Sequence, residues 1–337
     1  MSASAIWLSE NDVSGLVSLK DAIGALEDGL RALGSGDGFN IDKALGSFGS
    51  ASSMHSLGSA LPGVGFCGYK NWINTPQGAK ALYVLFDAVN GRLLALMEAN
   101  VLGQLRTSAM TGLGTKWLTR PGVDDMALIG SGRQALAQVA AVHLVRPLAR
   151  LRVWSPTPEK RKAFCETLRA QFDFDVVEAA TLREATAGAP IVTTVTRART
   201  PFLEAKALDK GTHLNAVGAI LPASAEFHQD VFNRVGFIAV DDVSATRKAS
   251  REFIDYFDQG AGAGDWARVH PLSEVIAGGK GIAGDTDLTL FKSMGMGISD
   301  LSVAMLAYQR AREAGLGLEI PLTAGAAIRL VGDAPGI

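Results

Sequence analysis

The sequence contains few of the residues that form disulfide or metal sites. Its two cysteines, Cys67 and Cys165, lack the C-x-x-C spacing, and its five histidines are scattered. A disulfide framework or a zinc centre needs more of these side chains at closer and more regular intervals. We therefore expect no metal site and no disulfide, which suits a protein of the reducing cytoplasm.

Charge is also in short supply, and neither sign dominates. Charged residues make up 20% of the 337 residues, and the formal net charge is -2 at pH 7. Proteins that bind nucleic acids or anionic membranes usually carry an excess of Lys and Arg, so we expect neither partner. The N-terminal segment MSASAIWLSENDV lacks the basic start and apolar core of a signal peptide. We therefore expect a cytoplasmic location.

Residues 44–69 contain no Asp, Glu, Lys or Arg, which raises the question of a membrane span. Their apolar runs are too short for a span, and Ser and Gly are too frequent, as in GSFGSASS. We interpret this segment as strands and turns inside a globular fold. With 337 residues and 47% apolar residues, the chain is long enough for two domains with separate cores.

The hydrophobic pattern changes near residue 120. Before it, the pattern predicts an amphipathic helix, then strands from about 41 to 97 with a hairpin turn at Asn90-Gly91, then a helix ending near Leu118. After the helix breaker at 119–122, strands and helices alternate, which is typical of a parallel, doubly wound α/β sheet. Expected strands lie at 126–129, 151–154, 175–178, 191–195, 213–217 and 236–240, and expected helices at 20–34, 134–146, 158–171 and 298–315.

A glycine-rich stretch, IGSGRQA, joins the first of these later strands to the helix that follows. Gly130 and Gly132 match the first two glycines of the G-x-G-x-x-G/A fingerprint, and Ala135 takes the third small position. The first glycine permits a tight turn, the second lets a pyrophosphate approach the backbone, and the third small residue lets the helix pack on the strand. We predict that a dinucleotide binds here, with Arg133 and Gln134 beside it at the helix N-terminus. A plain tight turn is the alternative.

The end of the second strand, VWSPTPEKRK, bears on the choice between NAD(H) and NADP(H). An acidic residue there would hold the ribose hydroxyls and reject a 2′-phosphate. Ser155 and Thr157 occupy this position, the first acidic residue is Glu159, and Lys160 and Arg161 follow it. This pattern favours NADP(H), with Ser155, Thr157 and Lys160 at the cofactor, unless Lys160 and Arg161 merely form a solvated helix face.

Arg106 is the only charged residue in the segment ANVLGQLRTSAMTGLGT, residues 99–115. On a helix it would share one face with apolar side chains and would therefore point inward. The apolar members of that face are Leu102, Met110, Leu113 and Trp117. An inward guanidinium needs an anion to offset its desolvation. That anion is either a buried carboxylate of the protein or a bound ligand.

Lys70 presents a similar question in the stretch GFCGYKNWIN. A strand would place Lys70 on the same face as Phe66 and Trp72. A lysine among aromatic side chains on a buried face is costly unless it has a function. The alternative is a surface lysine that extends its ammonium group into solvent.

Four stretches of the sequence form a recognisable set: GRLLALMEANVLGQLRTSAMTGLGTKWL, LIGSGRQA, KGTHLNAVGA and LTLFKSMGMGISDL. Their order and spacing resemble the ornithine cyclodeaminase/mu-crystallin family. The resemblance implies a homodimer in which a Rossmann-type, doubly wound parallel sheet is inserted in a second, α+β domain. We therefore predict a substrate-binding and dimerisation domain from residues 1–119 and 298–337, and a dinucleotide-binding domain from residues 120–297.

The resemblance also implies roles for single residues. Arg106 belongs to an R-T-x-A motif whose arginine binds the α-carboxylate of an amino or imino acid, and a guanidinium fits that group with two parallel hydrogen bonds. Lys70 takes the place of a lysine that contacts the substrate carboxylate or passes a proton. Met54 takes the place of a pocket methionine, although a methionine is also common in a core. Asn215 and Val217 are expected near the nicotinamide, although an ordinary buried strand is equally consistent with them.

Three further residues stay as weaker candidates. Lys43 stands where the family often has an arginine, and it cannot grip a carboxylate with two parallel bonds. Lys43 or His55 could bind a second carboxylate if the substrate were dicarboxylic. Asp300 either supports the site residues or caps the last helix, and we favour a structural role.

One position argues against the cyclodeaminase reaction itself. Cyclodeaminases carry an Asp three residues after the valine of the Val-Gly pair at this strand end, where it serves as general base and amine anchor. In this chain Ile220 stands at the position expected for that Asp. Isoleucine can neither accept a proton nor pair with an ammonium group. We therefore predict NAD(P)H-dependent reduction of a small α-imino acid to the amino acid, or the reverse. The alternatives are a cyclodeaminase with an altered base and a non-enzymatic, mu-crystallin-like binding protein.

Overall fold

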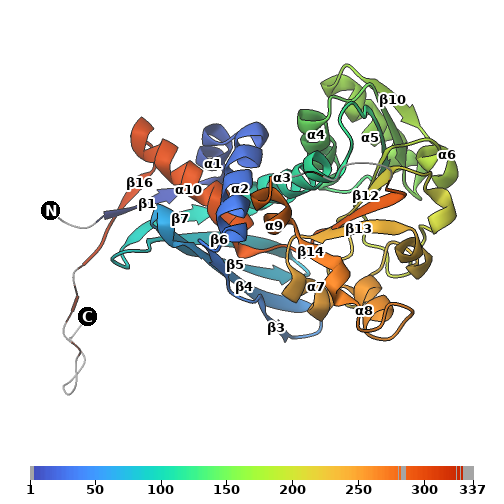
Figure 1. The fold of residues 1–337 in the computed structure, drawn as a ribbon. Coiled ribbons are helices and arrows are strands. Elements are labelled where there is room, and N and C mark those ends of the chain that lie inside the picture. Colours follow the sequence, from blue (N-terminus) through green and yellow to red (C-terminus); the bar gives the residue numbers. More distant parts are fainter. Residues whose placement is uncertain (1–3, 280, 282–285, 324, 327, 329–337) are drawn as a thin grey trace.

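The computed structural model describes residues 4–279, 281, 286–323, 325–326 and 328, which form two eight-stranded sheets (Figure 1). The first sheet has the order β16-β1-β7-β6-β5-β4-β2, and β3 pairs with β4. Its strands come from both ends of the chain, so β1 and β16 lie side by side. They are β1 (Ser4–Leu8), β2 (Phe39–Asn40), β3 (Ala44–Phe48), β4 (Ser52–Leu61), β5 (Phe66–Thr75), β6 (Gly78–Asp87), β7 (Leu93–Glu98) and β16 (Leu318–Pro321).

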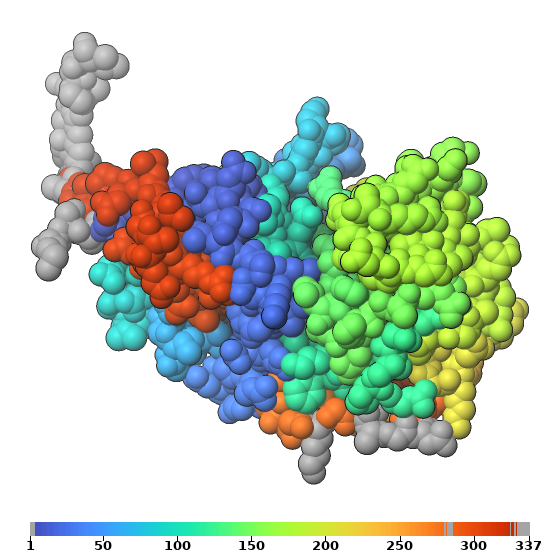
Figure 2. Space-filling view, turned by 90° about the horizontal axis from the view of Figure 1, so that it is seen from above, coloured from blue at the N-terminus to red at the C-terminus, as the bar shows by residue number. Residues whose placement is uncertain are grey.

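Several helices lie on one side of this sheet (Figure 1). They are α1 (Glu10–Leu16), α2 (Leu19–Gly34), α3 (Asn100–Leu118) and α10 (Gly297–Ala314). Ser9 and Ser18 start α1 and α2 with capping boxes, in which the serine hydroxyl and the third helical residue satisfy each other's backbone N–H groups. Seen from above, α10 lies against the N-terminal helices (Figure 2).

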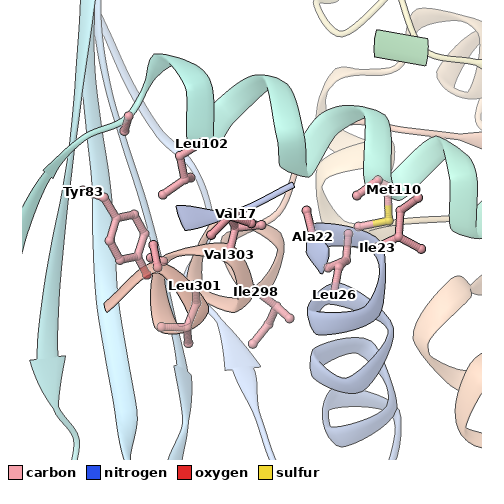
Figure 3. Packing of buried hydrophobic residues seen from close by; sticks show 14 of the residues in the cluster. Val17, Ala22, Ile23, Leu26, Tyr83, Leu102, Met110, Ile298, Leu301 and Val303 are labelled. Atoms are coloured by element: carbon pink, nitrogen blue, oxygen red, sulfur yellow. The ribbon is translucent and has the colours of Figure 1, made fainter. Parts of the chain in front are cut away.

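The first core lies between the sheet and these helices (Figure 3). Tyr83 and Leu85 enter it from β6, Leu26 from α2 and Leu301 from α10, and all are at most 1% exposed. Alternation along each strand gives the sheet a core face and an outer face. Lys70 and Trp72 of β5 lie on the core face with Tyr83, because Lys70 pairs directly with Tyr83 in the register.

The second sheet is parallel throughout, with the order β10-β9-β8-β11-β12-β15-β13-β14. Its strands are β8 (Asp125–Ile129), β9 (Arg150–Trp154), β10 (Asp175–Glu178), β11 (Ile191–Thr194), β12 (Thr212–Ala216), β13 (Val235–Val240), β14 (Val269–Pro271) and β15 (Leu288–Lys292). The strand order reverses between β8 and β11, and ligands of such sheets bind beside this point, at the carboxyl ends of the strands.

The helices that lie between strands of the second sheet are α4 (Ala135–Val145), α5 (Pro158–Gln171), α6 (Leu182–Thr186), α7 (Val243–Ala249), α8 (Arg251–Phe257) and α9 (Leu272–Ala277), with the 3-10 turns η2 (Ala205–Ala207), η3 (Gln229–Asn233) and η4 (Trp266–Arg268). The 3-10 turn η1 (Pro62–Val64) joins β4 to β5 of the first sheet. In the described parts of the chain, every helix is either too short or too polar for a transmembrane span.

The predicted α/β class with a parallel, Rossmann-type sheet is confirmed. The expected strands did not include β15, which enters the sheet between β12 and β13 although it follows both in the chain. The division at residues 119/120 and 297/298 stays a proposal, and the two separate sheets support it. Residues 1–3 and 329–337, which the proposed first domain includes, lie outside the described residues.

Candidate active site

A cleft of about 660 Å³ opens at the carboxyl ends of the strands in the second sheet. Its walls are the loops after β8, β9, β11, β12 and β15, together with two side chains from α3. The lining residues are Arg106, Thr107, Gly130, Ser131, Gly132, Arg133, Gln134, Ser155, Pro156, Thr157, Lys160, Val195, Thr196, Arg197, Val217, Gly218, Ile220, Ser293, Met294 and Gly295. The cleft therefore joins the glycine loop to the helix that carries Arg106.

The glycine loop forms one end of the cleft. Gly130 has φ +118, and a Cβ there would lie 2.7 Å from the carbonyl oxygen of Val195, so only glycine fits. A Cβ at Gly132 would meet no heavy atom within 4 Å, so the backbone there is open to an approaching group. Gln134 precedes α4, and the buried Oε1 of Gln134 has no hydrogen-bond partner among the described residues. Open backbone and a helix N-terminus suit a phosphate.

The end of β9 forms the next part of the wall. Ser155 accepts a hydrogen bond from the Ser131 hydroxyl at 3.0 Å, and Lys160 reaches the same cleft from α5. Arg161 does not join them: it is 8% exposed and donates to the Ser155 carbonyl at 2.8 Å and to Glu178 at 3.1 Å. Arg161 therefore holds the strand end and is not a solvated residue.

Asn215 lies outside the cleft, contrary to the expectation that it would contact the cofactor. Its side chain is fully buried, and its amide nitrogen donates to Thr115 of α3 at 2.9 Å. Its Oδ1 lies 3.0 Å from Nε2 of His213. Alternation along β12 turns this side chain into the sheet-helix interface. Val217, just after the strand, does line the cleft.

Arg106 forms part of the wall next to the carboxyl end of β15. It lies on α3, whose Leu102, Met110 and Leu113 are at most 1% exposed, so this helical face points inward as predicted. The Arg106 Nε lies 3.3 Å from Oδ1 of Asp300, without hydrogen-bond geometry. The Nη1 lies 3.0 Å from the position that a Cβ on Gly295 would take. Arg106 thus has a protein carboxylate on one side and open cleft on the other.

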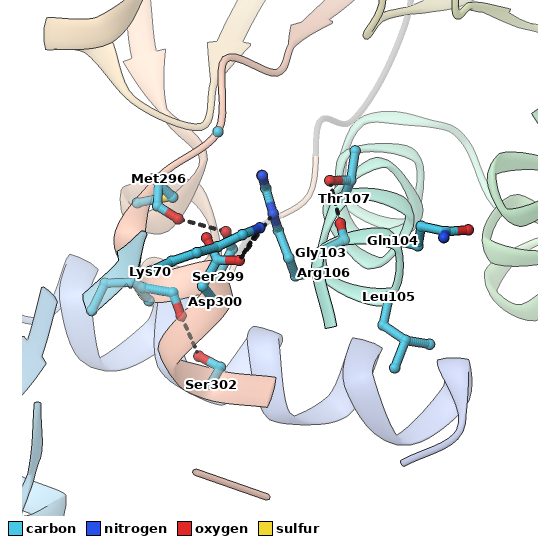
Figure 4. Close-up of polar contacts among 12 residues, drawn as sticks. Lys70, Gly103, Gln104, Leu105, Arg106, Thr107, Met296, Ser299, Asp300 and Ser302 are labelled. Carbon is cyan, nitrogen blue, oxygen red and sulfur yellow. Dashed lines mark hydrogen bonds and ion pairs between the residues drawn. The ribbon is translucent and has the colours of Figure 1, made fainter. Parts of the chain in front are cut away.

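Lys70 shares that carboxylate (Figure 4). It reaches from β5 and donates to Oδ1 of Asp300 at 3.0 Å, and Asp300 itself is fully buried in the first turn of α10. Lys70 is 6% exposed and lies behind Arg106, outside the lining of the cleft. Burial lowers the pKa of the Lys70 ammonium, and the neighbouring Asp300 opposes this effect.

Asp300 pairs with both Lys70 and Arg106, and the sequence did not predict these two contacts. It does not cap α10, which begins after Met296 without a side-chain cap. It is instead the shared partner of both cations, and its Oδ2 has no hydrogen-bond partner among the described residues. Its place in the SMGMGISDL motif marked Asp300 as a candidate, but the motif does not indicate that Lys70 and Arg106 are its partners.

Lys43 and His55 also belong to this region. Burial lowers the pKa of Lys43, and Arg106 lowers it further, while Asp241 and Asp242 oppose both effects. Burial likewise lowers the pKa of His55, with a smaller contribution from Lys43. His55 stacks on Trp72 with ring centroids 4.5 Å apart, and Lys70 Nζ lies 5.6 Å from the Trp72 ring.

Met54 is not brought to this cleft. It pairs with Ile73 in the register, on the outer face of the first sheet, and is 52% exposed. Since neighbouring residues of a strand point to opposite faces, His55 lies on the core face and Met54 does not. The prediction that Met54 contacts the substrate therefore has no support within a single chain.

Ile220 lines the cleft and is 40% exposed. No acidic side chain lines the cleft among the residues that the structure describes. Asp241 lies behind the loop that follows β15, where its carboxylate accepts from Ser293, Met294 and Gly295 at 2.8 to 2.9 Å. The local geometry thus offers no general base in place of Ile220.

Comparisons with known proteins agree with the resemblance. Residues 4–315 match the ornithine cyclodeaminase/mu-crystallin family. A Delta(1)-pyrroline-2-carboxylate reductase of Bacillus cereus is 32% identical over 71% of this chain and 73% of that protein. Ketimine reductase mu-crystallin of Mus musculus is 34% identical over 68% of this chain and 69% of that protein.

Solved structures extend the likeness to the whole fold. The structure of Thermococcus litoralis Delta(1)-pyrroline-2-carboxylate reductase in complex with NADH and L-proline has a TM-score of 0.85 and 28% sequence identity. The structural alignment covers 94% of this chain and 100% of the reductase chain. The family match covers both sheets apart from β16, and the predicted family is confirmed. The chain belongs to the ornithine cyclodeaminase/mu-crystallin family.

Proposed function

We propose that the protein is an NAD(P)-dependent oxidoreductase that reduces a small α-imino acid to the amino acid, or catalyses the reverse. One observation supports this most: Arg106 shares a cleft with the glycine loop of Gly130 and Gly132. The same cleft can therefore hold a dinucleotide and the carboxylate of a small metabolite. Relatives named as reductases of pyrroline-2-carboxylate and of ketimines support the same reaction class.

The residues of the cleft fit a dinucleotide. The open backbone at Gly132 and the start of α4, with Arg133 and Gln134, suit the pyrophosphate. Val217 and the loop after β15 lie at the other end, beside Arg106. When bound, NAD(P)H supplies the hydride for the imine carbon.

The chain's own residues orient the substrate and move the proton. Arg106 binds the α-carboxylate, because its Nη atoms border the cleft while its Nε faces Asp300. Asp300 balances only one of the two cations Lys70 and Arg106, so the site retains positive charge for an anion. Lys70, or a water that it holds, supplies the proton that the imine nitrogen gains when the carbon receives the hydride, since Lys70 itself lies behind Arg106 and outside the lining of the cleft.

The wall next to β9 favours NADP(H). Ser155, Thr157 and Lys160 line it, and it carries no carboxylate that would repel a 2′-phosphate. We expect Lys160→Ala to raise KM for NADPH by about 10-fold and to leave KM for NADH nearly unchanged, because a charge-assisted hydrogen bond contributes about 1.5–3 kcal/mol. Steady-state kinetics with both cofactors measure this. Lys162→Ala, an exposed neighbour on α5, is the matched control.

We also propose a homodimer formed through the outer face of the first sheet. Met54, Tyr69, Ile73 and Leu82 are 38–52% exposed there and form an apolar surface. Contiguous exposed apolar surface is typical of an interface. The helices cover the opposite face (Figure 1), so pairing through the outer face would leave the cleft open.

A substrate screen tests the reaction. Oxidation of NADPH and NADH is followed with Δ1-pyrroline-2-carboxylate, with other cyclic ketimines, and with mixtures of 2-oxo acids and amines. We expect cofactor oxidation in proportion to amino acid formed. Release of ammonia from ornithine with catalytic cofactor would instead indicate a cyclodeaminase. Tight cofactor binding without turnover of any imino acid would indicate a non-enzymatic binding protein.

A further inference from the structure

Three loops of the cleft wall are tied together by charged side chains that do not line the cleft. The loops follow the adjacent strands β11, β12 and β15 and pass through residues 195–198, 217–221 and 293–295. Glu226, Glu252 and Lys292 lie beneath them and are at most 2% exposed. None of the roles proposed above uses these three residues.

Glu226 joins the first loop to the second. Its carboxylate accepts from the Thr194 hydroxyl at 2.9 Å, and from the Thr196 backbone N–H and hydroxyl at 2.7 and 2.8 Å. It also accepts from the backbone N–H groups of Gly218 at 2.8 Å and Ala219 at 3.3 Å. Five donors therefore point at this carboxylate, whose two oxygens can each accept more than one hydrogen bond.

Lys292 joins the second loop to the third. It is fully buried at the end of β15, and its Nζ donates to the carbonyl of Ala219 at 2.6 Å. Its Nζ also lies 3.5 Å from Oε2 of Glu252, whose Oε1 accepts from the backbone N–H of Glu226 at 2.9 Å. The residue after Lys292 is Ser293, where the third loop begins, and Asp241 accepts from the Ser293 hydroxyl and from the backbone N–H of Met294.

The first two loops are in direct contact at Gly218. A Cβ there would lie 2.2 Å from the carbonyl oxygen of Thr196 and 2.4 Å from Oε1 of Glu226. The Glu226 carboxylate therefore sets the spacing of the two loops at the point where Val217 and Thr196 face the cleft.

Buried charges are costly, and apolar side chains of similar size would fill the same space with less desolvation. Apolar side chains cannot bind backbone N–H and C=O groups, as Glu226 and Lys292 do in the first and second loops. We propose that Glu226 and Lys292 are positioning residues that hold these loops in the arrangement that receives the nicotinamide ring beside Arg106. This inference rests on the proposed function, because it assumes that the dinucleotide occupies the cleft.

The test separates the nicotinamide end of the cofactor from the rest. Glu226→Gln and Lys292→Met keep the side-chain size and remove the charge. Binding of NADPH is compared with binding of 2′-phospho-ADP-ribose, a fragment of NADPH that lacks the nicotinamide. We expect the affinity for that fragment to stay within about 2-fold, while NADPH binds about 5-fold more weakly and its bound nicotinamide has a shorter fluorescence lifetime. In the imine-reducing assay, kcat should fall by about 20-fold or more.

Arg234→Met is the matched control. Arg234 pairs with Asp287 and donates to the carbonyls of Ala205 and Leu208, away from the cleft. The Arg234→Met variant should have a lower Tm, while its bound-nicotinamide fluorescence lifetime and its kcat should stay within about 2-fold of the wild-type values. If Lys292→Met does not fold, Thr194→Val, which removes one bond to Glu226, should shift the lifetime in the same direction by a smaller amount.

Two results would overturn the positioning role: an unchanged nicotinamide lifetime in the folded variants, or an equal loss of affinity for NADPH and for the fragment. A wild-type protein that binds NADPH but reduces no imine would refute the proposed function. The binding and lifetime measurements would still decide the positioning role in that case.

Discussion

Lys70 and Arg106 are two cations that share one buried carboxylate. Asp300 lies 3.0 Å from the Lys70 ammonium and 3.3 Å from Nε of Arg106. Burial lowers the pKa of Lys70 from its usual 10.5, and the charge of Arg106 contributes to the same shift. A lysine in this environment can lose its proton at lower pH than a surface lysine, as a proton donor in catalysis must.

This arrangement predicts the alkaline limb of the pH profile. If Lys70 donates the proton, only its protonated form is active, so kcat/KM should fall as the pH rises through a pKa below 10.5. Lys70→Met should lower kcat by about 100-fold, within the range expected for losing a general acid. Lys70→Arg keeps the charge and does not titrate in this range, so any residual activity should lack the alkaline limb. An unchanged alkaline limb in Lys70→Arg would assign the titration to another group.

Some features of single residues could be predicted from the sequence, and others could not. The tight turn after β8 could be predicted because the backbone conformation and close packing at Gly130 admit only glycine. The partners of Asp300 could not, because Lys70 lies 230 residues away from it in the chain. The directions of Met54 and Asn215 depended on strand register, and a shift of one residue reverses the face of every side chain.

Helix α3 is the element that joins the two sheets. Arg106 reaches the cleft from it, and Thr115 near its end accepts a hydrogen bond from Asn215 of β12. At Gly114, a Cβ would lie 2.6 Å from the ring of Phe291 on β15. The helix therefore approaches β15 as closely as a glycine allows. Its apolar periodicity predicted the helix itself, whereas the place of β15 in the sheet is a long-range property that no local pattern contains.

Gly114→Ala should lower the stability of the folded protein by about 1–3 kcal/mol, because the added methyl group overlaps a fully buried aromatic ring. Gly24→Ala in α2 is the matched control, since a Cβ there meets no heavy atom within 4 Å. It should be neutral or stabilise by up to about 1 kcal/mol. Urea denaturation measures both. Equal stability of the two variants would contradict the close packing of α3 on β15.

Across the molecule, the second sheet carries the glycine loop after β8, and the first sheet carries Lys70 on β5. The change of pattern near residue 120 predicted two regions of different topology, and their division into two domains stays a proposal. The outer face of the first sheet was not predicted as an apolar surface, because the strand pattern alone does not say which face the helices cover.

Ile73→Glu should dissociate the proposed dimer, because it places a charge at the centre of the apolar outer face. Val89→Glu is the control: Val89 is 83% exposed in the loop between β6 and β7, outside that face. Sedimentation measures the mass of each variant at several concentrations. A wild-type monomer, or an Ile73→Glu variant that remains a dimer, would exclude this interface.

We propose that Arg106 binds the carboxylate of an imino acid beside the bound cofactor. The most direct measurement compares kcat/KM for Δ1-pyrroline-2-carboxylate with that for Δ1-pyrroline, which lacks the carboxylate, in the wild type and in Arg106→Met. We predict that the wild type prefers the acid by about 100-fold or more, as expected for a bidentate, charge-assisted contact, and that Arg106→Met loses most of this preference. The same preference in both proteins would contradict the claim.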